Sequence, residues 1–383
     1  MIYLDNASTT KMFDQVNKKM FEINSDEYFN PSALYQKAID TSNMIKSARE
    51  ELSRNLGTSE EHILFTSGAT EGNNLAIFGF ATGKKDAEYI FGYGEHPSVF
   101  NAANALKTQN KIVKFVNLSK DGTVNIKELQ NLLTPNTHFV SIMHVSNETG
   151  SVNDIKTICE IVKSYNKNII VHCDGTQAFG KIYVNVAELG VDCYTISAHK
   201  FHGPKGVGAI YVKNLDKLKP LFYGGGQQKD KRSGTENVSG IVGMSLASSI
   251  AIKNLDVNFE KTQQHRNYII ENLQKNCSDF VINQAKNNSP YILSVSFKGI
   301  RGEVLLHMLE QQGIIIGTGS ACSSKKQGNR ILENMGVPKD YILGSIRISL
   351  SSFNTFDEIK TATNEIINQY KILKENMSKW KKL

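Results

Sequence analysis

Short apolar runs alternate with segments of helical spacing over the first part of the chain. Between residues 33 and 56 apolar positions recur every three or four residues, which predicts a helix that Gly57 is suited to end. Further helices are expected to begin near Thr70 and at Pro97, since proline suits a first helical turn. The apolar runs predict buried strands; they cover residues 62–66, 89–91, 139–143, 169–173, 191–196 and 208–212.

This alternation predicts an α/β domain with a mostly parallel sheet, in which ligands gather at the carboxyl ends of the strands. After about residue 255 a long polar helix precedes a strand–helix–strand pattern at 292–297, 303–311 and 344–350, which predicts a smaller α+β domain. We therefore expect a large domain over 15–255 and a small domain over 256–383. Residues 1–14 should form an N-terminal arm that packs with the small domain.

Composition restricts the class of protein without naming its function. The 383 residues are 40% hydrophobic and 21% charged, as in an ordinary globular enzyme, with a net charge of +7. That mild positive charge suits an acidic partner or tRNA, but direct nucleic-acid binding is not expected. The start of the chain lacks a basic stretch followed by an apolar one, and no segment approaches ~18 apolar residues, so no membrane is expected and the predicted location is the cytoplasm.

The cysteines do not form a recognisable framework. They are odd in number and show no Cys-x-x-Cys spacing, so neither a set of disulfides nor a cysteine zinc site is predicted, and no metal is expected. Cys173 and Cys193 lie within apolar strands and are expected in the core. Cys322 differs, because it follows Gly319-Ser320-Ala321 in a polar, glycine-rich segment typical of an exposed loop.

The segment Ser197-Ala198-His199-Lys200 follows a predicted strand and ends in a lysine. A lysine at this position can form an imine with an aldehyde cofactor, while Ser197 and His199 can donate hydrogen bonds to a phosphate. The alternative is that Lys200 is simply solvated, as most lysines at strand ends are.

Gly68-Ala69-Thr70 lies between a strand and a helix, where small residues leave backbone N–H groups accessible to an anion. Thr70 adds a hydroxyl donor. In the alternative interpretation, the segment is an ordinary turn in which Thr70 caps the helix.

Other polar side chains follow strands in the same order. Asp174 could pair with a pyridinium nitrogen, Gln177 could reach the hydroxyl of that ring, and His96 could stack on it. Asn147 adds a side-chain amide. Each has an ordinary alternative, an acidic helix cap for Asp174 and a polar surface position for His96. Their order along the chain nevertheless predicts a pyridoxal 5'-phosphate enzyme.

Two further residues suggest the second half of the chemistry. An exposed Cys322 thiol can meet a substrate, and Lys325 and Lys326 would favour its thiolate if they lie close, although they can equally be a solvated pair. Arg347 alternates with Ile346 and Ile348 along a strand, so it can face a site and bind a carboxylate with two hydrogen bonds. A solvent-facing arginine is the alternative.

Taken together, these residues resemble the cysteine desulfurases of the NifS/IscS-like group, among the enzymes related to class V aminotransferases. The resemblance runs nearly from end to end. It is carried by motifs at residues 3–10, 30–32, 68–71, 147–150, 197–200, 232–237 and 319–322, and by Arg347.

The resemblance implies fold type I of the pyridoxal phosphate enzymes, with a mainly parallel seven-stranded sheet, and a homodimer. It assigns Lys200 as the lysine that binds the cofactor, Cys322 as the sulfur acceptor, and Arg347 with Asn147 as the groups that hold the substrate carboxylate. It further implies that Thr235 reaches the cofactor of the neighbouring subunit.

The implied reaction converts L-cysteine to L-alanine and a persulfide on Cys322. Lys200 would remove the Cα proton, and His96 would carry a proton near the ring. The sulfur would pass to a protein acceptor for iron–sulfur cluster assembly or tRNA thiolation, and the residues do not choose between these. The alternatives are a selenocysteine lyase, another lyase or an aminotransferase on the same scaffold, or a non-catalytic sulfur carrier.

Overall fold

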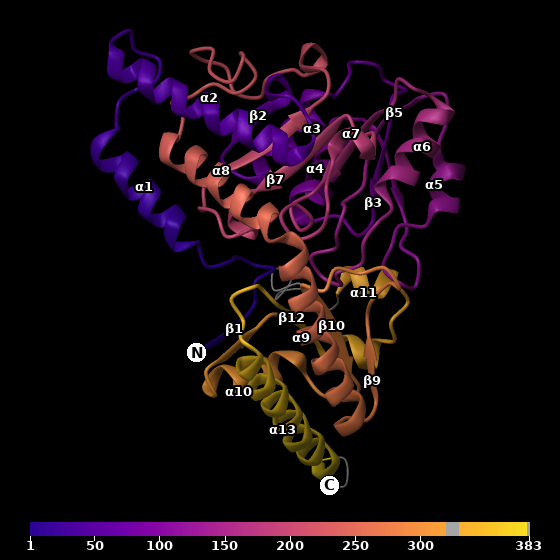
Figure 1. Cartoon of the computed structure of the whole chain (residues 1–383). Coiled ribbons are helices and arrows are strands. Elements are labelled where there is room, and N and C mark those ends of the chain that lie inside the picture. Colours follow the sequence, from indigo (N-terminus) through magenta and orange to yellow (C-terminus); the bar gives the residue numbers. More distant parts are fainter. Residues whose placement is uncertain (319–328, 381–383) are drawn as a thin grey trace.

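A seven-stranded sheet forms the larger body of the computed structural model, which describes residues 1–318 and 329–380, the last four by backbone only (Figure 1). Its strand order is β2-β8-β7-β6-β5-β3-β4. The five strands from β4 to β7 are parallel, whereas β8 is antiparallel to both of its neighbours. The strands are β2 (Ile63–Thr66), β3 (Glu88–Gly92), β4 (Ile112–Val116), β5 (Thr137–Ser141), β6 (Ile170–Asp174), β7 (Cys193–Ser197) and β8 (Gly208–Val212).

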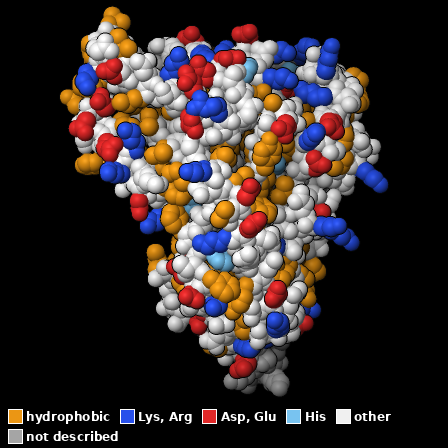
Figure 2. Space-filling model, in the orientation of Figure 1, with side chains coloured by type: hydrophobic (Ala, Val, Ile, Leu, Met, Phe, Trp, Pro, Cys, Tyr) orange, Lys and Arg blue, Asp and Glu red, His pale blue; other side chains and the backbone are white. Residues whose placement is uncertain are grey.

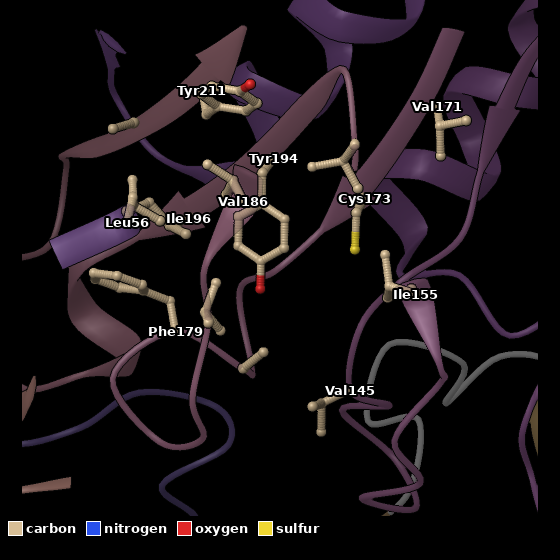
Figure 3. Close-up of a cluster of buried hydrophobic side chains, with 14 of the residues drawn as sticks. Leu56, Val145, Ile155, Val171, Cys173, Phe179, Val186, Tyr194, Ile196 and Tyr211 are labelled. Carbon is tan, nitrogen blue, oxygen red and sulfur yellow. The ribbon is translucent and has the colours of Figure 1, made fainter. Parts of the chain in front are cut away.

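Helices cover both faces of this sheet, which is why its strands read as continuous apolar runs. Along β8, Ala209 and Tyr211 join a core shared with α2, α6 and α8, while Ile210 and Val212 join a core shared with α3 and α4. Figure 3 shows part of the first core. The helices of this body are α1 (Asp14–Asp26), α2 (Gln36–Leu56), α3 (Ala69–Gly79), α4 (Pro97–Thr108), α5 (Ile126–Leu132), α6 (Ile155–Tyr165), α7 (Val186–Leu189) and α8 (Val238–Lys253).

A smaller antiparallel sheet of order β12-β10-β9 lies below the first in Figure 1 and has its own core. Leu4 belongs to this core, because β1 pairs in parallel with β11. The division into domains at residues 14 and 255 stays a prediction. The elements are β1 (Ile2–Leu4), β9 (Phe280–Ile282), β10 (Ile292–Phe297), β11 (Ile314–Ile316), β12 (Ser345–Ser349), α9 (Leu255–Asn276), α10 (Gly302–Gln311), α11 (Arg330–Asn334), α12 (Lys339–Ile342) and α13 (Phe356–Trp380).

The predicted elements are present, with shifted ends. Gly57 ends α2 in the left-handed conformation, with φ of 72°, as expected, but the helix begins at Gln36 rather than near residue 33. The strand expected over 139–143 ends at Ser141, although the N–H of Ile142 still donates to a β6 carbonyl at 3.1 Å. The expectation of a mainly parallel α/β sheet is confirmed.

Acidic and basic side chains are interspersed over the face drawn in Figure 2. Among the described residues, no single helix has the length and apolar character of a membrane span. Only α8 and α9 taken together, across a bend of 69°, reach that threshold by length and composition.

Close approach between two glycines brings the start of α3 against β8. A Cβ on Gly208 would lie 2.7 Å from Gly68 Cα and 2.7 Å from the carbonyl oxygen of Ile196. Neither backbone atom can rotate away, so any side chain at residue 208 forces the two segments apart.

Gly208→Ala should therefore lower the free energy of unfolding by about 1–3 kcal/mol, as overpacked positions do. Chemical denaturation monitored by circular dichroism measures the change. Gly83→Ala is the matched control, because a Cβ there meets nothing within 4 Å and the backbone φ is not positive. Equal midpoints for both variants would contradict this steric interpretation.

Candidate active site

Lys200 ends a 3₁₀ turn, Ala198–Lys200, that follows β7 directly. Its Nζ donates to the carbonyl oxygens of Ala7 and Ser8, each at 2.7 Å. Burial, together with the positive charge of Arg347, lowers the pKa of Lys200 to about 8 against the opposing effect of nearby carboxylates. The amine therefore exists partly in its neutral, nucleophilic form near neutral pH.

The N-terminus of α3 forms a cradle of small residues. Gly68 is the N-cap, with φ of 153°, and no side chain of the described residues caps the helix. Ala69 and Thr70 begin the helix, so the alternative in which Thr70 is the cap is wrong. A Cβ on Gly68 would lie 3.7 Å from Ser197 Oγ, which places this buried hydroxyl beside the cradle. Uncapped N–H groups and neighbouring hydroxyls are the donors that a phosphate requires.

Asp174 is the last residue of β6 and is buried. Its Oδ2 accepts a hydrogen bond from Asn73 Nδ2 at 2.8 Å, and its Oδ1 accepts one from the N–H of Thr176 at 3.0 Å. Residues 176–180 form a turn, so Asp174 does not cap a following helix. Sequence reasoning missed Asn73. Its position one helical turn after the phosphate cradle was the available signal.

His96 is the N-cap of α4, and its Nδ1 accepts a hydrogen bond from the N–H of Ser98 at 3.1 Å. His96 lies at an exposed position, as its alternative interpretation expected, yet the loss of solvent around its ring is the main cause that lowers its pKa. Asp174 opposes this effect, while Lys200 adds to it. The imidazole is therefore neutral at neutral pH and can accept a proton.

Arg347 is only 7% exposed, so the solvent-facing alternative is wrong. Its Nη2 donates to Asp5 Oδ1 and to Ser8 Oγ, both at 2.8 Å, and its Nη1 donates to the carbonyl oxygen of Asn147 at 2.9 Å. Among residues 1–318 and 329–380, neither the buried Nε of Arg347 nor the buried Oδ1 of Asn147 has a hydrogen-bond partner. Asp5, which the sequence analysis did not assign a role, thus positions the guanidinium.

Gln177 and His199 both contact the N-terminal segment. Gln177 Nε2 donates to the carbonyl oxygen of Ala7 at 2.9 Å, the same oxygen that accepts from Lys200. His199 Nδ1 lies 3.1 Å from Thr9 Oγ1. Burial, with a contribution from Lys200, lowers the pKa of His199 to about 4, so its ring is neutral and one nitrogen carries a proton to donate.

Thr235 does not join these residues through any described contact and is exposed. Its segment is nevertheless tied to the cradle, because Arg232 Nε donates to Glu71 Oε1 at 2.8 Å and Glu71 lies in the first turn of α3. The implied role of Thr235 at a neighbouring subunit stays a prediction.

Cys322 lies outside the described residues, together with Lys325 and Lys326. Cys173 and Cys193 are fully buried, and burial raises the pKa of both thiols, so the core positions predicted for them are confirmed.

Two further residues escaped sequence reasoning. Arg330, the first residue of α11, donates its Nη2 to the carbonyl oxygen of Glu95 at 2.8 Å and lies 3.9 Å above the ring centre of Phe100. Burial, and next the charge of Asp174, raise the pKa of Glu95. The only signal for Glu95 in the sequence was its position directly before His96. Nothing local pointed to Arg330, whose partner is 235 residues away.

These residues fit pyridoxal phosphate. The cradle at Gly68 and Ser197 suits its phosphate, the half-buried amine of Lys200 suits its aldehyde, and the buried carboxylate of Asp174 suits its ring nitrogen. Asn147 Oδ1 and Arg347 Nε, which have no hydrogen-bond partner in the described part of the chain, are polar atoms that a bound polar molecule would satisfy.

Comparisons with known proteins agree with this fit. The family model described as Aminotransferase class-V matches residues 2–361. A protein named Cysteine desulfurase IscS from Dictyoglomus turgidum is 36% identical over 99% of this chain and 98% of its own. A solved structure named NIFS-like protein superposes with a TM-score of 0.92 at 34% identity, covering 97% of this chain and 100% of its own. Another, named SspA in complex with cysteine, has a TM-score of 0.82 at 29% identity, with coverages of 93% and 100%.

The lowered pKa predicts how Lys200 titrates in the cofactor-free protein. Competitive acetylation across a pH series, read by mass spectrometry, should give Lys200 a midpoint at about 8, with peptides that carry exposed lysines as the internal reference. Arg347→Met should raise the midpoint, because a neighbouring positive charge is removed. A midpoint at the ordinary lysine value of 10.5 would contradict the role of burial.

Proposed function

Because the chain belongs to the class-V aminotransferase family and, within it, to the cysteine desulfurases, it is a pyridoxal phosphate-dependent enzyme, and we propose that it converts L-cysteine to L-alanine and a persulfide on Cys322. Support for the substrate comes from the chain's similarity to relatives named cysteine desulfurase and to the solved structure named SspA in complex with cysteine.

The observation that carries this proposal is the meeting of two cationic groups at one residue. Lys200 Nζ donates to the Ser8 carbonyl, and Arg347 Nη2 donates to the Ser8 hydroxyl. An amine suited to an aldehyde and a guanidinium suited to a carboxylate therefore lie beside each other, as the conversion of an amino acid requires.

Bound pyridoxal phosphate supplies an electron sink for the Cα carbanion of an amino acid. We assign its phosphate to Ala69, Thr70, Ser197 and His199, its aldehyde to Lys200, and its ring to His96, Asp174, Gln177 and Asn147. Thr235 is assigned to the cofactor of a neighbouring subunit.

The chain's own residues then hold the substrate and move its protons. Arg347, with Asn147, binds the carboxylate of L-cysteine. With the cofactor bound, Lys200 would accept the Cα proton at Nζ, which its pKa of about 8 permits near neutral pH. His96, neutral under the same conditions, takes the proton of the substrate thiol or returns one.

Sulfur transfer is a displacement at the sulfur atom of the substrate. The Cys322 thiolate attacks that sulfur, so an S–S bond forms while the Cβ–S bond breaks. The electron pair of the broken bond, with a proton, becomes a C–H bond at Cβ, and Lys200 returns the Cα proton, which together yield L-alanine. The persulfide sulfur then passes to a protein acceptor. The name shared by the relatives, IscS, leads us to favour iron–sulfur assembly, with tRNA thiolation as the alternative.

Product analysis tests this function. The purified yellow protein, given L-cysteine and a thiol reductant, should release alanine and sulfide in equal amounts. Cys322→Ser should keep the cofactor absorbance and its change on adding L-cysteine, but lose sulfide release by at least ~100-fold because no thiolate can take the sulfur.

Cys277→Ser is the matched control, because Cys277 is a half-buried thiol at the end of α9 and should be dispensable. Pyruvate with ammonia would indicate a β-eliminating lyase instead. Turnover of selenocysteine alone would indicate a selenocysteine lyase, and normal turnover by Cys322→Ser would remove that residue from the mechanism.

We also propose that the enzyme is a homodimer. Large apolar side chains remain exposed over α1, α2 and their connection, at one end of the larger body (Figure 1), namely Phe21 (72%), Tyr28 (73%), Leu34 (96%) and Ile39 (46%). Such an exposed apolar cluster, on a protein whose described surface otherwise carries mixed charges, supports association with a second copy of the same chain.

Sedimentation velocity should give about twice the 42.6 kDa of one chain. Leu34→Asp should shift the protein towards the single-chain mass, because a charge would be buried at the interface. Val257→Asp, which changes an equally apolar residue that is 69% exposed on α9, should not. A single-chain mass for the unchanged protein would contradict the homodimer.

A further inference from the structure

Lys181 is a lysine that none of the roles above explains. It is 5% exposed and lies in the turn after β6, close to Gln177. Its Nζ donates to Gln177 Oε1 at 2.7 Å and lies 5.9 Å from the ring centre of Tyr291. In the part of the chain that the structure describes, no carboxylate forms an ion pair with it. Burial of a long cationic side chain without a counter-ion is costly, so the hydrogen bond to Gln177 is its principal compensation.

This hydrogen bond, together with the one that Gln177 Nε2 donates to the Ala7 carbonyl, sets which way the Gln177 amide faces. An ammonium group has N–H donors and no acceptor, so it requires the amide oxygen on its side. The amide nitrogen is then directed to the carbonyl oxygen of Ala7, at 2.9 Å, and this oxygen also accepts from Lys200 Nζ at 2.7 Å. A chain of polar contacts therefore runs from Lys181 through Gln177 and Ala7 to Lys200.

We propose that Lys181 is a positioning residue that holds the Gln177 amide with its N–H groups towards the cofactor, so that Gln177 donates to the hydroxyl oxygen of the pyridoxal ring. The inference rests on the proposed function, which assigns Gln177 to that ring. With the amide reversed, Oε1 would face the ring oxygen, and two acceptors would oppose each other.

The surroundings of Lys181 are cationic or neutral. Lys200 and Arg347, from the turn after β7 and from β12, act on it, while His202 and Tyr291 line the same pocket. Burial, followed by these two positive charges, lowers the pKa of Lys181 to about 7. Its N–H groups can donate to Gln177 in either charge state, but only the ammonium form, which has no acceptor, requires the amide oxygen to face it.

Two substitutions separate hydrogen bonding from charge. Lys181→Gln keeps an N–H donor for Gln177 Oε1, whereas Lys181→Met has similar length and no donor, and both remove the positive charge. The readout is the visible absorbance of the pyridoxal phosphate-loaded protein, titrated with pH in the absence of L-cysteine. Loss of the donor should let the amide reverse. A reversed amide would no longer donate to the ionised ring oxygen, which would then be less stable. The titration midpoint of Lys181→Met should therefore lie above that of Lys181→Gln by about half a pH unit, the effect of one hydrogen bond.

In a Gln177→Leu background the difference between the two variants should vanish, because Lys181 acts through that amide. Equal midpoints for Lys181→Gln and Lys181→Met with Gln177 intact would overturn the proposal, whatever their melting temperatures. If Lys181→Met does not fold, Gln177→Met with Lys181 intact should itself raise the midpoint, and an unchanged midpoint would overturn the proposal as well. Since no L-cysteine is used, these results are independent of the desulfurase assay. A chain that takes up no cofactor would contradict the proposed function instead.

Discussion

The site depends on hydrogen bonding by one irregular segment near the N-terminus, residues 5–10. Its backbone carbonyls hold Lys200 and Gln177, and the Asp5 carboxylate holds Arg347. Ser349, on the small sheet, bonds to the same segment through both its hydroxyl and its carbonyl. Because side chains near both sheets form hydrogen bonds with this one segment, the segment fixes the positions of these side chains relative to one another.

Burial explains why these groups are chemically unusual. After burial itself, the positive charges of Lys200 and Arg347 lower the pKa of Lys181, and that of Arg347 lowers the pKa of Lys200. Among the described residues, Arg347 forms an ion pair with Asp5, whereas neither lysine has a carboxylate within ion-pair distance. Burial has the opposite effect on Glu95, the residue directly before His96, because it raises the pKa of this carboxyl. Such opposed shifts within one region are typical of sites that handle protons.

Sequence patterns predicted the parallel sheet and the residues at its strand ends, because the central strands are mostly apolar and end at polar side chains, as β6 ends at Asp174. They could not predict contacts made across long sequence separations. Arg347 was expected at the site, but its partner Asp5 is 342 residues away, and Asn73 reaches Asp174 across 101. Lys181 carried no signal at all, because a lysine after a glycine in a turn is normally solvated.

The bond between the two ends of the chain has a consequence for biosynthesis. Residues 5–8 leave the ribosome long before β12, which carries Arg347 and Ser349. The parallel sheet can fold while translation continues, as domains generally do, but the contacts that Arg347 and Ser349 make with residues 5–8 must wait until β12 has been synthesised. A truncated product of interrupted synthesis would therefore contain Lys200 and the phosphate cradle without the means to hold an amino acid, so premature chains should be unable to begin the reaction.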